Sequence, residues 1–148
     1  AALFGVRQVI SYEGQAAIEL EAFADPAETG VYPLEISPDN TIRLAPLITE
    51  MINDFQQGVQ LPTLSGRFHN SLAELVLELA RQAKGRYSLN RVALSGGVWQ
   101  NMSLLTKTID ALSGAGFQVL THHQIPPNDG GVSLGQAAIG LKTLSVED

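Results

Sequence analysis

Residues 94–101 have the composition of a ligand-binding turn. They read Leu-Ser-Gly-Gly-Val-Trp-Gln-Asn and join a short apolar run to a helical pattern through Gly96 and Gly97. Glycines let a backbone turn sharply and approach a ligand closely, and the free N–H groups of a helix start favour an anion. Asn101, predicted one turn into the helix, could donate to and accept from a ribose or a base. A tight strand-to-helix turn without a ligand fits equally well, because the segment is neither G-x-G-x-x-G nor a Walker loop.

A second segment, residues 126–131, reads Pro-Pro-Asn-Asp-Gly-Gly and precedes another helical pattern. Asn128 or Asp129 could simply cap that helix, a common role for these residue types. Alternatively, Asp129 presents a carboxylate to a metal–phosphate group from a loop stiffened by two prolines. The two glycines favour the second interpretation, because capping does not require them and each costs about 1 kcal/mol of helix propensity.

The histidines and the basic residues give weaker indications of a metal or phosphate site. His122 and His123 are adjacent at the end of a predicted strand, so they point to opposite sides and one metal could hardly take both. His69 is predicted to be a cap or a half-buried hydrogen-bonding residue. A cationic cluster could hold a phosphate or an acidic partner, but it is more typical of a solvated helix end. Its members are Arg81, Lys84, Arg86 and Arg91.

Alternating strands and helices must position these segments. Residues 92–94 and 117–121 are predicted strands, and the intervening helix carries apolar residues at spacings of 4, 3, 4 and 3 from Val98 to Leu112. A last helix is predicted over 131–144. This alternation implies a right-handed crossover, so we expect the two strands to be neighbours in one parallel sheet with both helices packed against it.

The upstream half is predicted to contain three helices and one hairpin. Pro26 ends the first helix, and Ser-Pro-Asp-Asn at 37–40 is a good four-residue turn between two strands. The predicted bounds are a helix over 15–24, strands over 32–36 and 41–44, a helix from Pro46 to Gly58, a loop over 57–66, and a helix from Phe68 to Gly85.

The composition excludes several classes of protein. With 148 residues, 45% hydrophobic, the chain suits one domain or one lobe of a larger domain. It has no Cys, which excludes disulfides, a thiolate nucleophile and Cys-bound zinc. A net charge of −6 argues against broad capture of nucleic acid. Neither a membrane span nor a signal peptide is indicated, so we expect a cytoplasmic protein. Because residue 1 is Ala, we also expect a piece of a longer polypeptide.

The two glycine-containing segments, in this order and spacing, resemble the C-terminal part of the HypF family, the carbamoyltransferases of NiFe-hydrogenase maturation. Residues 11–19, Ser-Tyr-Glu-Gly-Gln-Ala-Ala-Ile-Glu, and 67–70, Arg-Phe-His-Asn, extend the resemblance over nearly the whole chain. The related TsaD family, which makes threonylcarbamoyladenosine on tRNA, shares the Ser-Gly-Gly-Val and Asp-Gly motifs. The longer motifs Ser-Tyr-Glu-Gly-Gln and Pro-Pro-Asn-Asp-Gly-Gly favour HypF over TsaD.

The resemblance implies an α/β fold, with residues 1–148 forming the second lobe of an actin/sugar-kinase/Hsp70-like (ASKHA) two-lobed domain. Nucleotide would lie between the lobes. The residues expected to contact it are Ser95, Gly96, Gly97 and Asn101, with Glu13 and Gly14 near the ribose. Asp129 would supply one ligand to a divalent metal ion. The family's other metal ligands, two histidines in H-x-x-x-H spacing, have no counterpart in this chain.

The resemblance also implies a reaction for the longer protein. Upstream domains would make carbamoyl-adenylate from carbamoyl phosphate and ATP, and the two-lobed domain would pass the carbamoyl group to the C-terminal Cys of the partner HypE. The isolated lobe is expected to be inactive, and neither nucleic acid nor a membrane is an expected partner. A TsaD-like or sugar-kinase-like nucleotide-binding lobe, or a non-catalytic lobe that docks a partner, are the alternatives.

Overall fold

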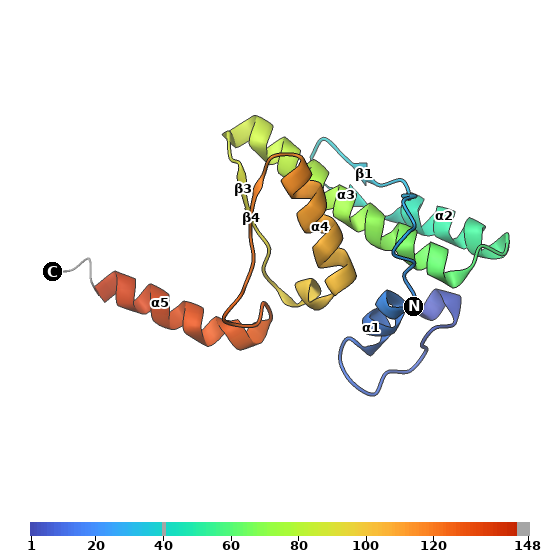
Figure 1. Ribbon diagram of the computed structural model, residues 1–148, viewed down its shortest axis with the longest axis horizontal. Helices are drawn as coiled ribbons and strands as arrows, with labels where there is room; N and C mark the ends of the chain where they lie inside the picture. Colours follow the sequence, from blue (N-terminus) through green and yellow to red (C-terminus); the bar gives the residue numbers. More distant parts are fainter. Residues whose placement is uncertain (40, 145–148) are drawn as a thin grey trace.

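The long helix α3 (Leu61–Tyr87) is the central element of the computed structural model, which describes residues 1–39 and 41–144. The helices α2 (Ala45–Gln56) and α4 (Met102–Gly114) pack against it (Figure 1). One buried cluster consists of Tyr32, Leu47, Met51 and Leu64. A second consists of Leu77, Ala80, Leu94, Leu112 and Phe117. Because α3 supplies residues to both clusters, it holds the two halves of the chain together.

α3 begins several residues earlier than the sequence predicts, so the predicted loop over 57–66 is wrong beyond Gln60. Pro62 lies in the first turn of the helix, where its missing N–H costs no hydrogen bond. Gly66 is buried inside the helix, and a Cβ there would lie 2.8 Å from the Cβ of Glu28. These residues are typical of loops in a sequence, but here they start a helix and allow close packing.

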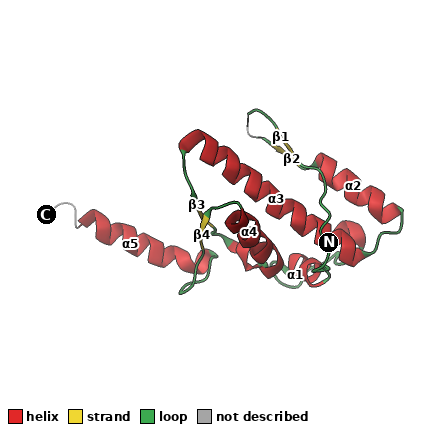
Figure 2. Cartoon of the chain, turned by 45° about the horizontal axis from the view of Figure 1, so that its top comes forward, coloured by secondary structure: helices red, strands yellow, loops and turns green. Residues whose placement is uncertain are grey.

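The predicted parallel strand pair is confirmed. β3 (Arg91–Ala93) pairs in parallel with β4 (Gln118–Leu120), with Val92 opposite Val119. The backbone N–H of Leu94 also donates to the carbonyl of Leu120 at 2.9 Å. Figure 2 shows how short the strands are beside the helices, so the fold is mixed α/β with a small sheet.

The helix after the Gly-Gly turn starts later than predicted. A short 3₁₀ helix, Gly97–Gln100, comes first, and α4 begins at Met102. Asn101 has an extended backbone conformation and is the N-cap of α4, so the prediction that it lies one turn inside the helix is wrong. The apolar spacing continues through Val98, and periodicity alone therefore could not reveal the cap.

The last helix, α5 (Val132–Leu144), is present as predicted but does not pack against the sheet. It projects away from the other elements (Figure 1), and Leu134, Ile139 and Leu141 are more than half exposed. The prediction of its packing is therefore wrong. Helical periodicity identifies the helix, but the direction in which the preceding loop sends it decides what covers it.

The first helix and the hairpin of the upstream half are present, but both strands are shorter than the predicted bounds of 32–36 and 41–44. α1 (Gln15–Ala22) ends two residues before the predicted bound, and β1 (Glu35–Ile36) pairs antiparallel with β2 (Ile42–Arg43). Asn40, part of the predicted turn, lies outside the described residues. A 3₁₀ helix, Ala2–Phe4, precedes α1.

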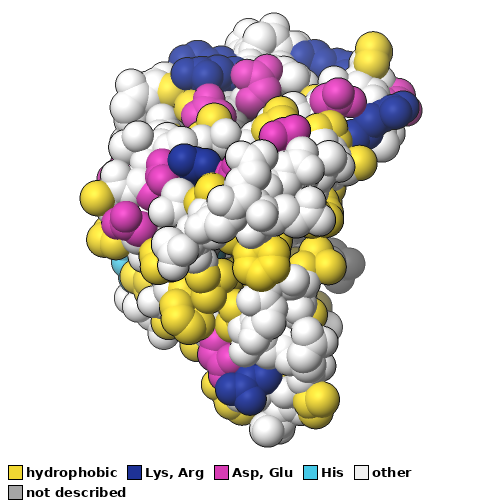
Figure 3. Space-filling view, turned by 90° about the vertical axis from the view of Figure 1, so that its right-hand side faces the viewer, with side chains coloured by type: hydrophobic (Ala, Val, Ile, Leu, Met, Phe, Trp, Pro, Cys, Tyr) yellow, Lys and Arg dark blue, Asp and Glu magenta, His cyan; other side chains and the backbone are white. Residues whose placement is uncertain are grey.

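The surface carries charges of both signs. On the face shown in Figure 3, basic and acidic side chains are interspersed, and hydrophobic side chains gather in the lower half. Within residues 1–39 and 41–144, no helix is long and apolar enough to cross a lipid bilayer.

Candidate functional site

The two glycine-containing segments lie against each other at the carboxyl ends of β3 and β4. The backbone N–H of Gly96 donates to the carbonyl of Pro127 at 2.7 Å, and a Cβ on Gly97 would lie 3.9 Å from the Cβ of Asn128. Gly96 has φ +110° and ψ 160°, a conformation that L side chains rarely adopt. Ligands of open α/β sheets bind at the carboxyl edge of parallel strands, so this junction is the candidate site.

In the second segment the helix cap is Asn128. The sequence left open whether Asn128 or Asp129 is the cap, and whether Asp129 instead presents its carboxylate to a ligand. The side-chain oxygen of Asn128 accepts from the backbone N–H of Gly130 at 3.1 Å and caps the 3₁₀ helix Asp129–Gly131. The exposed carboxylate of Asp129 is therefore not the cap of this turn.

The two glycines of this segment allow the loop to close on itself. A Cβ on Gly131 would lie 3.0 Å from the carbonyl oxygen of Pro126, and one on Gly130 would lie 3.1 Å from the Cγ of Pro126. The close backbone approach inferred from the sequence is therefore present, but it is an approach within the loop.

Asn101 connects the site to the interior of the fold. Its Oδ1 accepts from the backbone N–H of Leu104 at 2.8 Å, and its Nδ2 donates to Nε2 of His69 at 2.9 Å. His69 lies in α3 with only 2% of its surface exposed. The sequence treats His69 as a cap or a half-buried residue, whereas the structure places it directly behind a candidate ligand-binding amide.

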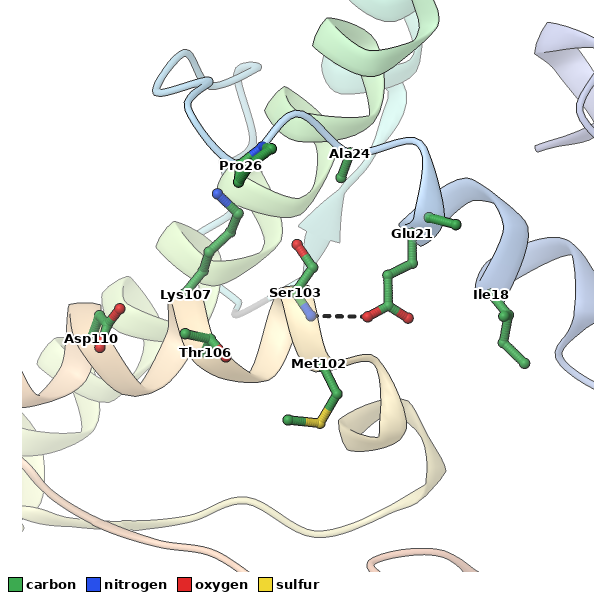
Figure 4. A pocket seen from close by; sticks show the side chains of 10 residues that line it. Ile18, Glu21, Ala24, Pro26, Met102, Ser103, Thr106, Lys107 and Asp110 are labelled. Carbon is green, nitrogen blue, oxygen red and sulfur yellow. Dashed lines mark hydrogen bonds between the residues drawn. The ribbon is translucent and has the colours of Figure 1, made fainter.

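The N-terminus of α4 is not open to an anion, contrary to the prediction from the Gly-Gly turn. The backbone N–H of Ser103 donates to a carboxylate oxygen of Glu21 at 2.9 Å (Figure 4). The backbone N–H of Leu104 donates to Oδ1 of Asn101. Glu21 is at the end of α1, so the helix dipole of α4 holds α1 in place.

Beside the Glu21–Ser103 contact, α1 and α4 enclose a groove of about 730 Å³. Ile18 and Met102 contribute apolar surface, while Thr106, Lys107 and Asp110 contribute polar atoms (Figure 4). Volumes of about 300–1,000 Å³ with a mainly apolar lining and a few polar groups are typical of small-molecule sites. The groove begins next to Asn101, at Met102 and Ser103.

Glu13 and Gly14 lie at the opposite end of α1 from Glu21. Gly14 precedes the helix with φ +81°, a conformation that favours glycine. Seven residues separate Gly14 from Glu21, which corresponds to about 10 Å along a helix. A single ligand contacting both Gly14 and Asn101 would therefore have to extend along α1.

His122 is a functional candidate that sequence reasoning missed. Its Nε2 lies 2.9 Å from the hydroxyl oxygen of Ser95. In the parallel register Ala93 pairs with Leu120, and Ser95 and His122 each follow their strand by two residues. The register of the predicted strands is thus the signal that could have found this pair.

The Arg-Phe-His-Asn motif is mainly structural. Arg67 donates to the carboxylate of Asp54 at 2.7 Å, and Asn70 donates to the carbonyls of Glu28 and Gly30. Desolvation and the Asp54 carboxylate both raise the pKa of Tyr32, whose hydroxyl donates to Asp54 at 2.8 Å. These contacts attach the loop after α1 to α2 and α3.

Three of the four members of the cationic cluster have local partners. Arg81 lies 3.6 Å from Glu74, Lys84 lies over the ring of Phe117, and Arg86 lies over the ring of Tyr87. These contacts support the interpretation of a helix end rather than a phosphate site.

In the described part of the chain, no group of three or more His, Asp or Glu side chains could hold a metal ion. Asp129 therefore belongs to no such group, and a divalent metal needs further ligands. The residues present do not by themselves fit a metal centre.

Comparison with known proteins shows which family this chain belongs to. Residues 1–136 match the family described as the carbamoyltransferase Kae1-like domain, second subdomain. The chain belongs to the HypF family of carbamoyltransferases. It is 38% identical over 140 residues to carbamoyltransferase HypF of Synechocystis sp., covering 92% of this chain and 18% of the relative. It is 37% identical to that of Rhodobacter capsulatus, covering 90% of this chain and 17% of the relative.

Two solved HypF structures share the fold. One, described as full-length HypF in the phosphate- and nucleotide-bound form, matches with a TM-score of 0.91 at 38% identity over 97% of this chain and 19% of that chain. HypF of T. kodakarensis matches with a TM-score of 0.78 at 27% identity over 95% of this chain and 18% of that one. The chain thus spans about a fifth of the length of these relatives. These matches favour HypF over the TsaD-like and sugar-kinase-like alternatives.

Proposed function

We propose that this chain is the nucleotide-facing second lobe of an ASKHA-type two-lobed domain in a cytoplasmic carbamoyltransferase of hydrogenase maturation. The observation that carries the proposal is the junction of the Ser95–Gly97 turn with the Pro127–Asn128 loop at the carboxyl ends of β3 and β4. The likeness to a HypF structure described as phosphate- and nucleotide-bound supports a nucleotide in the corresponding protein family.

In this proposal the chain binds and orients the nucleotide of carbamoyl-adenylate, which the full-length protein forms from ATP and carbamoyl phosphate. The backbone of Gly96 and Gly97 and the hydroxyl of Ser95 face the phosphate end. The Asn101 amide contacts the nucleoside beside the groove between α1 and α4, and Glu13 and Gly14 lie toward the ribose. Asp129 supplies one ligand to a divalent metal, whose other ligands come from outside this chain.

The acceptor is the C-terminal Cys of HypE. Its thiolate attacks the carbamoyl carbon, a C–S bond forms, the bond between that carbon and the phosphate oxygen breaks, and AMP leaves with the electron pair. The chain has no Cys that could take this role. Donors near the phosphate oxygens would lower the barrier, because they stabilise the charge on the leaving group. The Ser95 hydroxyl is the proposed donor of this turn, since the Gly96 N–H is already bonded to the Pro127 carbonyl.

Paired substitutions in the full-length protein test the proposal. Asp129→Asn keeps the shape of the side chain but removes its charge, so metal content and carbamoylation of HypE should fall sharply. Asn101→Ala should weaken ATP binding by roughly 1–3 kcal/mol, the cost of an unpaired polar group, with metal content unchanged. Asp39→Asn is the control, because Asp39 is likewise an exposed carboxylate in a turn but lies outside the proposed site.

The readouts are metal analysis, calorimetric titration with ATP, and mass spectrometry of the HypE C-terminus. Full activity in both Asp129→Asn and Asn101→Ala would contradict the proposal and leave a scaffold that only docks a partner. The 148-residue chain alone should carbamoylate no HypE, because it spans only about a fifth of the length of the relatives it matches.

A further inference from the structure

The hydrogen bonds of His69 determine which of its ring nitrogens carries the proton. Nδ1 lies 2.7 Å from the backbone carbonyl of Ser65, which can only accept. The hydroxyl of Ser65 donates to the carbonyl of Leu20 at 2.5 Å, so it too presents a lone pair to Nδ1, 3.4 Å away. The proton must therefore be on Nδ1, and in the neutral ring Nε2 is an acceptor.

The same reasoning fixes the orientation of the Asn101 amide. The backbone N–H of Leu104 can only donate, so the amide oxygen must face it, at 2.8 Å. The amide nitrogen then points at Nε2 of His69, 2.9 Å away, where an acceptor is needed. One N–H and one lone pair of the amide remain beyond these two bonds.

We propose that His69 is a positioning residue that, by accepting from the Asn101 amide nitrogen, sets the rotation of that amide and presents its remaining N–H and lone pair to a bound ligand. That the ligand is a nucleotide rests on the proposed function. Three hydrogen bonds form one continuous chain: Ser65 to His69 within α3, His69 to Asn101, and Asn101 to the backbone of Leu104 at the start of α4.

The surroundings of His69 favour the neutral ring. Burial lowers the pKa of His69, and Lys107 on α4 acts in the same direction. The Ser65 carbonyl and the Glu21 carboxylate on α1 oppose this shift. The ring of Phe68 packs edge-on at 5.5 Å between centroids. A proton on Nε2 would face the Asn101 NH₂ group with a second donor, and the amide would have to turn.

Two variants of His69 in the full-length protein separate this role from general packing. His69→Phe keeps an aromatic ring but removes the acceptor, whereas His69→Gln offers an amide oxygen to Asn101. Ser71→Ala is the matched control, because Ser71 is equally buried in α3 and bonds to Tyr32 and Arg67 rather than to Asn101. The first readout is hydrogen exchange at the Leu104 amide, resolved by mass spectrometry. The second is the dissociation constant for ATP, measured also in Asn101→Ala and in His69→Phe/Asn101→Ala.

We expect His69→Phe to speed exchange at Leu104 by about fivefold or more, the effect of losing one hydrogen bond, while His69→Gln and Ser71→Ala do not. ATP binding should weaken about tenfold in His69→Phe, and the double variant should bind no more weakly than Asn101→Ala within about threefold. Unchanged exchange in His69→Phe, or equal acceleration in Ser71→Ala, would overturn the proposal. So would additive losses of ATP affinity. If exchange responds as expected but Asn101→Ala binds ATP normally, the positioning role stands and the nucleotide role of Asn101 fails.

Discussion

Gly96 and Gly97 are neighbours in sequence, yet substitution by Ala should destabilise the fold at Gly96 and leave its stability nearly unchanged at Gly97. Gly96 has φ +110° and ψ 160°, so a side chain there is strained even though nothing lies within 4 Å of its Cβ position. Such a conformation costs a non-glycine residue about 1–3 kcal/mol. At Gly97 the backbone is not in the left-handed region, and an added methyl group would meet Asn128 at 3.9 Å, an ordinary van der Waals distance.

Gly96→Ala should therefore lower the free energy of unfolding by about 1–3 kcal/mol, whereas Gly97→Ala should change it by less than about 0.5 kcal/mol. Urea unfolding of this chain, followed by circular dichroism, measures both differences. In the full-length protein, Gly97→Ala should still weaken ATP binding if a ligand approaches the turn as proposed. Equal losses of stability in the two variants would refute the reasoning from backbone conformation.

Three further predictions concern the pH dependence of stability, the buried core and the exposed helix α5. Because burial lowers the pKa of His69, the folded state binds fewer protons than the unfolded state, whose pKa is about 6.5. Stability should be complete above about pH 6.5 and should fall below it with a slope of at most about 1.4 kcal/mol per pH unit; His69→Gln should remove this slope in urea titrations. Replacing Leu112, which is 0% exposed, by Ala should lower the free energy of unfolding by about 2–5 kcal/mol. Replacing Leu141, which is 70% exposed on α5, by Ala should lower the free energy of unfolding by less than about 0.5 kcal/mol in the same urea unfolding assay, and a large loss would contradict the exposed placement of α5.

Local sequence patterns predicted the helices and strands well where apolar spacing and residue type indicated the same structure. The apolar run near Val92, the helical spacing through Leu112 and the strand ending near Leu120 gave a parallel pair that the structure confirms. The rules conflicted at Pro62 and Gly66. Both are typical of loops, but Pro tolerates the first helical turn and Gly66 leaves room for Glu28. The loop interpretation therefore failed at Pro62 because proline is equally compatible with a helix start, and at Gly66 because the partner that requires a small residue, Glu28, lies 38 positions away along the chain.

The sequence by itself determined the two glycine-containing segments, the strands that carry them and the family resemblance. Each of these depends on residues close together along the chain, where conformational preference and spacing carry the information. Only the tertiary structure decided that Asn128, and not Asp129, is the cap, and that α5 does not pack against the sheet. It also decided that His69 reaches Asn101 across 32 positions, because a hydrogen bond between α3 and the start of α4 depends on how the helices pack, which no local pattern records.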